Sequence, residues 1–241
     1  MEYQIKAMDM WFRTLPGALV VEMEFKELDR LLPSIPGEVA VQIGGPSNLR
    51  LLQKSKMRHV YYCSDQRAGL GDGTCLQCDY HALPFESNSI NLIILSHAIE
   101  FAKQPQQLLE EIYRVLRPGG QLLLFGFNRW SGWSLVRRLR HYKGYPWHGR
   151  FHSMWQVKKW LHTLGYGIVA NKSFCFIPPC TKRPSATWIK LNEVLGQVFI
   201  PKMGAVHLIY AQKKVAGTTP LATLWTAKPK RLPKVVITST H

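Results

Sequence analysis

The chain has 241 residues, of which 46% are hydrophobic, enough to bury a substantial core in one principal domain. No apolar stretch approaches the roughly 18 residues that a membrane span needs, and the N-terminus shows no charged segment followed by an apolar one. Five cysteines, without the spacing of a disulfide framework, are typical of reduced thiols. We therefore expect a cytoplasmic protein with no transmembrane segment.

The net charge of +16 is concentrated in the second half of the chain. Residues 1–120 carry a net charge of −2 and residues 121–241 a net charge of +18. Beyond Glu111 the single acidic residue is Glu193. This asymmetry favours contact with RNA, an anionic lipid surface or an acidic small molecule, with a generally basic surface as the alternative.

The first 37 residues are expected to form an N-terminal helical extension. The apolar spacing of residues 16–32 predicts an amphipathic helix, with Pro16 in its first turn, and LPSIPG ends it. Ahead of it, MDMWFRTLPG gathers Met8, Met10, Trp11 and Phe12. These side chains either pack onto the core or form a lid over a pocket.

Strand and helix patterns alternate from residue 39 onward. Strands are predicted at residues 39–43, 59–65, 75–79, 90–96 and 121–127, and helices at 47–56 and 104–116, the second ended by the turn RPGG. Because these strands are continuous apolar runs, both faces of the sheet should be covered. The pattern predicts an α/β fold with a doubly wound, mostly parallel sheet and helices on both faces.

The pattern loosens after residue 128. Residues 131–142 are predicted to form a basic helix, residues 153–170 a helix, turn and strand, residues 184–197 a further helix, and residues 204–214 the last strand. The main domain is expected to span residues 38–214. Residues 215–241, rich in Thr, Pro and Lys, are expected to form a mobile tail because they offer little apolar surface to bury.

A zinc site is the weakest of the chemical options. Cys75 and Cys78 form a CxxC pair, and Cys175 with Cys180 would have to complete four ligands, but the second pair has the wrong spacing. We expect ordinary buried thiols and no metal. GxSxG, HExxH and P-loop motifs are absent from the sequence.

Two segments carry a family resemblance: VAVQIGGPSN at residues 39–48, and CDYHALPFESNSINLIILSHAIEFAKQPQQLLEEIYRVLRPGGQLLLFGFN at residues 78–128. They resemble the class I S-adenosylmethionine-dependent methyltransferases of the methyltransferase type 11 group. The resemblance implies a Rossmann-like fold with a seven-stranded sheet whose last strand is antiparallel. It also implies S-adenosylmethionine as the cofactor.

The first motif of that family is degenerate here. The resemblance places the strand-ending acid and the alternating glycines of the family at Gln42, Gly44, Pro46 and Asn48, with Gly45 in the same turn. Gln42 lacks the charge of an acid, Pro46 lacks an N–H donor, and Asn48 tolerates positive φ better than most residues. We expect weakened but retained cofactor binding.

Two aspartates are predicted to hold the rest of the cofactor. Asp65 lies 21 positions after Gly44, near the roughly twenty that separate the glycine turn from the ribose-binding acid in dinucleotide-binding folds. A surface-loop aspartate is the alternative, with Asp72 as a substitute. In DYHALPF the resemblance implies that Asp79 accepts the adenine amino group, with Tyr80 beside the ring and an apolar wall from Leu83 to Phe85.

The predicted acceptor side lies after the fourth and fifth strands. Ser96 ends the fourth strand and should face the cofactor, since ligands of such sheets bind beyond the carboxyl ends of the strands. His97 is a weak candidate for a general base or a substrate contact, and a packed structural histidine is the favoured alternative. Asn128 and Trp130 are candidate substrate contacts, followed by the basic residues of 137–143.

The sequence therefore predicts a methyltransferase that acts by direct displacement on an unidentified acceptor, with small molecules, lipids and RNA all open. The alternative is a catalytically weak methyltransferase-like domain that binds RNA or an anionic membrane surface through its basic half. A dehydrogenase fits poorly because the glycine fingerprint is incomplete and DYHALPF has no role in it.

Overall fold

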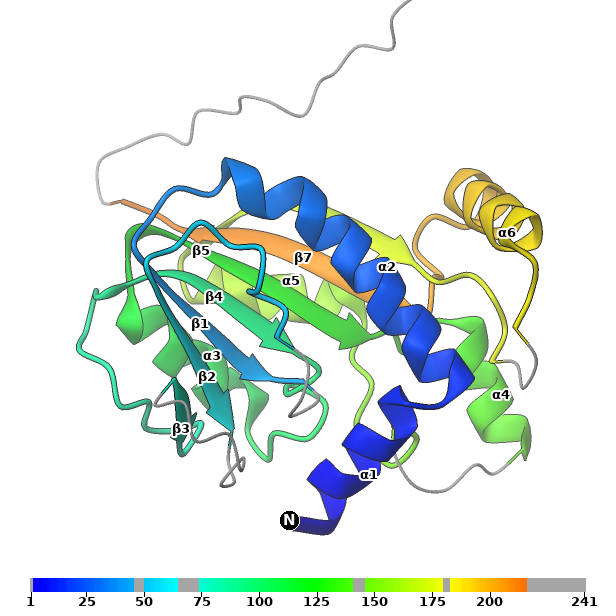
Figure 1. Ribbon diagram of the computed structural model, residues 1–241, viewed down its shortest axis with the longest axis horizontal. Coiled ribbons are helices and arrows are strands. Elements are labelled where there is room, and N and C mark those ends of the chain that lie inside the picture. The colour runs from blue at the N-terminus through cyan, green and yellow to red at the C-terminus, as the bar shows by residue number, and fades with distance from the viewer. Residues whose placement is uncertain (1, 46–49, 65–73, 141–145, 180–182, 216–241) are drawn as a thin grey trace, which may run out of the picture.

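The computed structural model describes residues 2–45, 50–64, 74–140, 146–179 and 183–215 (Figure 1). Asp65, Asp72, Cys180, the second half of the glycine turn (46–49) and the tail beyond residue 215 lie outside the described residues.

A seven-stranded sheet forms the centre of the molecule, in the order β3-β2-β1-β4-β5-β7-β6. The strands β3, β2, β1, β4 and β5 run parallel to one another, and β7 runs antiparallel to both β5 and β6. The predicted fold class, including the antiparallel last strand, is thus confirmed. The strands are β1 (Val39–Gly44), β2 (His59–Ser64), β3 (Cys75–Gln77), β4 (Ile90–Ser96), β5 (Leu116–Phe127), β6 (Tyr166–Phe174) and β7 (Val206–Lys213).

Helices cover both faces of the sheet, and α2 crosses one of them (Figure 1). Alternate residues of the central strands supply two apolar clusters. Leu92 and Ile94 of β4 pack with residues of the N-terminal helices, whereas Ile93 and Leu95 pack with α3 and α5. The helices are α1 (Glu2–Phe12), α2 (Leu15–Leu31), α3 (Pro105–Val115), α4 (Gly132–Arg140), α5 (Met154–Thr163) and α6 (Ala186–Phe199), with a short 3-10 turn η1 (Leu32–Ser34) after α2.

The N-terminal segment packs onto the core. Met8, Trp11 and Phe12 of α1 are buried, while Met10 is exposed. The Trp11 ring meets the Phe127 ring edge to face at a centroid distance of 5.7 Å. Since Phe127 ends β5, α1 lies against the end of the sheet toward which the parallel strands point (Figure 1).

Two local predictions were wrong. Residues 51–54, expected within a helix, form a turn, because the backbone N–H of Leu51 is bonded to the Gln42 side chain and the hydrogen bonds of Gln53 and Ser55 span only three residues. RPGG is not a separate turn either. It belongs to β5, with an irregular register against β4, and Gly119 adopts a φ of +79° that allows the chain to bend there.

The later elements form where the sequence predicted them. The Ser153 and Ser185 hydroxyls cap α5 and α6 by accepting the N–H groups of Gln156 and Trp188. Helix α6 carries an exposed apolar face that includes Val194 and Val198. Among the helices of the described residues, none is long and apolar enough to cross a membrane.

Candidate functional site

The candidate site lies at the carboxyl edge of the parallel strands. Gly44, which ends β1, is paired with Ser96, which ends β4, and Ser96 is paired with Phe125 of β5. The loops that follow these strands therefore meet at one edge, where open α/β sheets bind their ligands. Of the predicted site residues, Gln42, Gly44, Gly45, Ser96 and His97 come together here, and Asp79 lies after β3, two strands away from β1.

The glycine turn is held tightly against the end of β4. Gly44 and Gly45 adopt φ values of +72° and +80°, in the left-handed region that glycine enters without strain. A Cβ on Gly44 would lie 2.6 Å from the carbonyl oxygen of Ser96, and one on Gly45 would lie 3.0 Å from the Ser96 hydroxyl. Both positions therefore require glycine.

Gln42 stabilises this turn from inside. Its side chain is buried, its Oε1 accepts the N–H of Leu51 at 2.8 Å, and its Nε2 donates to the carbonyl of Gly44 at 3.2 Å. An aspartate or glutamate could not donate to that carbonyl. The amide at the position of the family's acid thus has a structural explanation: it links both sides of the turn.

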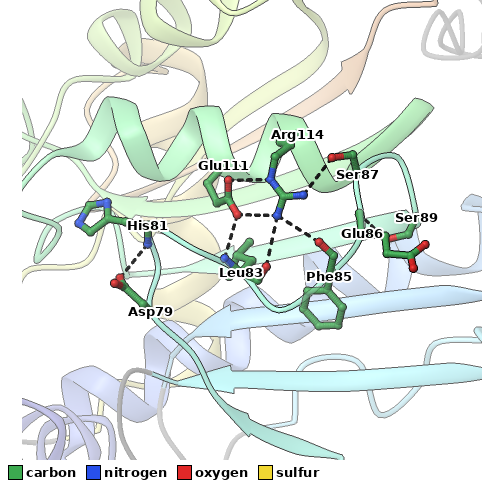
Figure 2. Close-up of polar contacts among 9 residues, drawn as sticks. All are labelled: Asp79, His81, Leu83, Phe85, Glu86, Ser87, Ser89, Glu111 and Arg114. Atoms are coloured by element: carbon green, nitrogen blue, oxygen red, sulfur yellow. Dashed lines mark hydrogen bonds and ion pairs between the residues drawn. The ribbon is translucent and has the colours of Figure 1, made fainter.

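Asp79 stands exposed after β3 (Figure 2). One of its carboxylate oxygens accepts the N–H of His81 at 2.9 Å, which fixes the start of the loop. Tyr80 is half-buried against the cluster on the α3 face, Leu83 is buried, and the Phe85 ring lies 5.7 Å from the Tyr61 ring. An exposed carboxylate beside an apolar wall is suited to bind a flat ring that carries an amino group.

Glu111 and Arg114 of α3 hold this loop in place, and the sequence analysis did not single them out. The carboxylate of Glu111 accepts the N–H of Leu83 at 2.8 Å. The Arg114 guanidinium donates to the carbonyls of Leu83 and Phe85, to the Ser87 hydroxyl and to Glu111 (Figure 2). Their spacing of three residues, opposite in charge, was the available signal, but it is equally typical of an ordinary surface pair on a helix.

His97 is buried and paired with acids from two elements. Its Nε2 lies 2.6 Å from Oε1 of Glu24 on α2, and its Nδ1 lies 3.5 Å from Oε1 of Glu100. Oε1 of Glu100 also accepts the N–H of Phe127 at the end of β5. The cluster of Glu24, His97 and Glu100 therefore ties α2, the loop after β4 and the end of β5 together.

The charges of this cluster set its protonation. Burial alone would lower the pKa of His97, but the charge of Glu24 and the contact with Glu100 outweigh it and raise the pKa to about 9. Nearby His207 of β7 lacks such a partner, and burial lowers its pKa to about 4. At neutral pH His97 is thus an imidazolium, which cannot accept a proton. The geometry supports the structural reading of His97 rather than the catalytic one.

Asn128 is engaged within the fold, whereas Trp130 is available at the surface. Asn128 Nδ2 donates to the carbonyls of Lys202 and Gly204, and its Oδ1 accepts the N–H of Trp130. Trp130 is 65% exposed and borders a hollow of about 470 Å³, together with other side chains from α3, α5 and the loop after β5. Of these two predicted substrate contacts, Trp130 is the one that faces solvent.

Cys75 and Cys175 lie too far apart to share a metal ion. Cys75 lies on β3 and Cys175 directly follows β6, and these strands form the opposite edges of the sheet. The four-cysteine zinc alternative is therefore wrong. In the described part of the chain, no group of three or more His, Cys, Asp or Glu side chains is placed to hold a metal ion.

Comparison with known proteins agrees with this geometry. The model of the methyltransferase domain family Methyltransf_11 matches residues 53–124, which run from the β1–β2 link to β5. Over this segment the chain is similar to that methyltransferase family. The matched segment contains Asp79 and Ser96 but not the glycine turn.

Similar curated proteins include an uncharacterized protein, YafS, of Escherichia coli, which is 30% identical over 147 residues, or 60% of this chain and 57% of YafS. A ubiquinone/menaquinone biosynthesis C-methyltransferase, UbiE, of Ruegeria is 41% identical over 51 residues, or 21% of this chain and 20% of UbiE. The alignments thus span between a fifth and about three fifths of these two relatives.

Solved structures share the fold over most of the chain. An S-adenosylmethionine-dependent methyltransferase of Thermotoga maritima superposes with a TM-score of 0.61 at 21% identity, covering 85% of this chain and 94% of the other. One from Archaeoglobus fulgidus has a TM-score of 0.59 at 16% identity, covering 80% and 94%. The methyltransferase fold is common to all three.

Described residues at this edge fit parts of S-adenosylmethionine. The two glycines at positive φ bring the backbone close to Ser96, and the Ser96 hydroxyl is a buried polar atom with no hydrogen-bond partner among the described residues. The Asp79 carboxylate is exposed, in the same loop as the buried Leu83 and the half-buried Phe85. These residues fit a ligand with a polar methionine end and a flat adenine end.

Proposed function

We propose that this protein transfers a methyl group from S-adenosylmethionine to an acceptor that enters beside the end of β5. The observation that carries the proposal is the glycine turn of Gly44 and Gly45, still closed against Ser96, at the same sheet edge as the exposed Asp79. The family match over residues 53–124 supports it. When bound, S-adenosylmethionine supplies an electrophilic methyl group for direct displacement by an acceptor atom.

The residues of the chain contribute binding and positioning to this reaction. Asp79 accepts the adenine amino group, the wall of Leu83 and Phe85 packs against the ring, and Tyr80 lies beside it. Gly44 and Gly45 admit the cofactor to the end of β1, and the Ser96 hydroxyl becomes hydrogen-bonded. Gln42 holds the turn in shape through its side-chain hydrogen bonds. Asp65 is proposed, as predicted from the sequence, to accept hydrogen bonds from the ribose hydroxyls.

Positioning is also the main catalytic device in the proposal. Holding an acceptor in line with a reactive group contributes up to roughly 7–11 kcal/mol to lowering a barrier. A protonated His97 cannot serve as a base at neutral pH, so the proposal assigns it to fixing the loop after β4. An acceptor that reacts without losing a proton first, or that loses it to water, fits this arrangement.

The acceptor is proposed to enter over Trp130. This residue borders the hollow of about 470 Å³ that also contains Trp155 and Lys159, a size within the range of roughly 300–1,000 Å³ for small-molecule sites. The relatives named for ubiquinone and menaquinone biosynthesis make a quinol-type lipid one class to test. We also propose that the protein acts in the cytoplasm, as expected from its reduced cysteines.

The test is calorimetric titration of the purified protein with S-adenosylmethionine and with S-adenosylhomocysteine. We expect micromolar binding, weakened about tenfold in Asp79→Ala, the usual cost of about 1.4 kcal/mol for a lost hydrogen bond to a charged group. Asp29→Ala, which removes an exposed carboxylate on α2, is the matched control and should bind like the natural chain.

Absence of binding at millimolar ligand by a folded protein would contradict the proposal. It would leave the alternative, a methyltransferase-like domain that binds RNA or an anionic membrane surface through its basic half, and that domain would not need a cofactor.

A further inference from the structure

A second hollow, of about 490 Å³, lies beside the first and contains a group of arginines. It opens between α4 and the chain from His148 to His152, and shares Arg129 and Gln156 with the hollow of Trp130. Four guanidinium groups border it, those of Arg129, Arg137, Arg138 and Arg150. None of the residues that border this hollow is acidic.

The four arginines of this hollow are not neutralised by neighbouring acids in the part of the chain that the structure describes. Within the described residues, none of the four forms an ion pair with a carboxylate. Arg137 donates to the carbonyl of Gly149 and lies over the Phe151 ring, which fixes its direction. Burial and the charge of Arg138 both lower the pKa of Arg137. The positive charges of these two arginines therefore repel each other. An anion bound among these side chains would relieve that repulsion.

The hollow is close to the proposed site of methyl transfer. The backbone N–H of Arg129 donates to the carbonyl of His152, and a bridge joins Asn128, directly after β5, to His152. The backbone N–H of Arg150 donates to the carbonyl of Glu100, in the loop after β4. The walls of the hollow are therefore attached to the strand ends that border the cofactor edge.

We propose that the hollow bordered by Arg129, Arg137, Arg138 and Arg150 binds a phosphate or diphosphate group of the methyl acceptor. Guanidinium groups match phosphate oxygens with paired hydrogen bonds, and four of them suit a group with more than one negative charge. The adjoining hollow, with Trp130 and Trp155, would hold the remainder of the molecule. Two joined hollows of small-molecule size favour a phosphorylated small molecule or lipid over RNA.

That this hollow binds an anion does not depend on the proposed methyl transfer. Only the statement that the anion is part of the methyl acceptor rests on the proposed function. The anion site and the cofactor site can fail separately, so both are measured on the same proteins. The probes are inorganic pyrophosphate for the anion site and S-adenosylhomocysteine for the cofactor edge, each titrated calorimetrically at 50 and 150 mM NaCl.

The informative variants are Arg129→Gln and Arg138→Gln, because both side chains are exposed and their loss does not open the core. We expect each to weaken pyrophosphate binding about tenfold and to leave S-adenosylhomocysteine binding unchanged. Arg117→Gln is the matched control. It removes an exposed arginine at the opposite end of the sheet, near the start of β5, and should leave both affinities unchanged.

Saturating pyrophosphate should also leave the affinity for S-adenosylhomocysteine unchanged, since the two ligands occupy different pockets. Sedimentation with vesicles that contain phosphatidic acid separates the two sources of the group. Vesicle binding that Arg138→Gln weakens indicates a lipid headgroup, and pyrophosphate binding without vesicle binding indicates a soluble phosphate ester.

Three results would overturn the proposal: no saturable pyrophosphate binding at millimolar concentration, an equal loss of binding in Arg117→Gln, or competition between pyrophosphate and S-adenosylhomocysteine. Binding of single-stranded RNA at least a hundredfold tighter than pyrophosphate would overturn it too, in favour of a nucleic-acid surface.

Discussion

Two groups of charged side chains lie near the same edge of the sheet and differ in how their charges are satisfied. Glu24, His97 and Glu100 are buried and paired with one another. The four arginines of the second hollow have no carboxylate partner within the described residues. The first group completes the fold, and the second is left for a ligand. Whether a charged side chain near the cofactor edge already has a partner of opposite charge therefore indicates whether it serves the fold or a ligand.

The largest effect that this comparison predicts is on stability, in Glu24→Ala. Glu24→Ala removes the closer of the two carboxylates that face His97 and leaves its Nε2 without that partner, while Glu100 still faces Nδ1. We therefore expect a loss of about 3 kcal/mol in the free energy of unfolding, at the low end of the cost of breaking a buried ion pair. Glu22→Ala is the control on the same helix. Glu22 pairs with Lys26 and Arg183 at the surface, where such pairs contribute about 0–1 kcal/mol. Urea unfolding of both variants measures the difference, and equal losses would show that the buried cluster is not structural.

The second prediction concerns pH. The pKa of His97 is raised to about 9 from an ordinary 6.5, so its stabilisation is complete below pH 6.5 and is lost as the pH rises through 9. The pKa of His207 is lowered to about 4, so its contribution holds above pH 6.5 and is lost as the pH falls through 4. We expect the free energy of unfolding, measured by urea titration, to be highest near pH 6.5 and to fall on both sides, by about 3 kcal/mol toward pH 9.5. A midpoint that stayed constant from pH 7 to 9.5 would contradict the pairing of His97.

The fold was predictable from the sequence where a local pattern reports burial, and not where a distant contact decides the structure. The central strands and α3 were predictable because continuous apolar runs and regular helical spacing report burial directly. Glu24 could not be recognised, since an acid within an amphipathic helix normally faces solvent, and only the packing of α2 over the loop after β4 shows otherwise. The helix predicted within residues 47–56 was wrong for residues 51–54, because the Gln42 side chain accepts the N–H of Leu51. Local helix propensity does not report such a contact.

The candidate site was predictable only in part for the same reason. Asp79 and the two glycines are adjacent to strand ends, so the predicted strands together with the family resemblance placed them. The arginine hollow required the chain near residue 150 to return beside α4, and the role of Arg114 required the loop after β3 to lie on α3. Such non-local contacts leave no periodic signal in the sequence.

The third prediction tests a residue that supports the site without touching a ligand. Arg114→Ala removes the donors that hold the carbonyls of Leu83 and Phe85 and should loosen the wall beside Asp79. We expect S-adenosylhomocysteine affinity to fall about threefold to fivefold, equivalent to about 0.7–1 kcal/mol. Arg117→Ala, nearby and exposed, serves as the control. Affinity unchanged in Arg114→Ala would mean that the loop keeps its shape without this contact.

The smallest predicted effect is on stability again, in Arg138→Gln. Because its neighbours in the hollow carry the same charge and it has no acidic partner among the described residues, removing it should change the free energy of unfolding by no more than about 0.5 kcal/mol, and toward greater stability at low salt. Urea unfolding at 20 and 500 mM NaCl measures this change. A clear loss of stability would place Arg138 with the structural charges of the first group.

The most direct test of the account is hydrogen exchange of the backbone, followed by mass spectrometry, with and without S-adenosylhomocysteine. The account predicts slower exchange on ligand binding in peptides that cover the end of β1 with its glycine turn, residues 79–85 and the end of β4, and no change at Arg117. No ligand-dependent change, or protection confined to the basic C-terminal half, would contradict the assignment of this edge as the cofactor site.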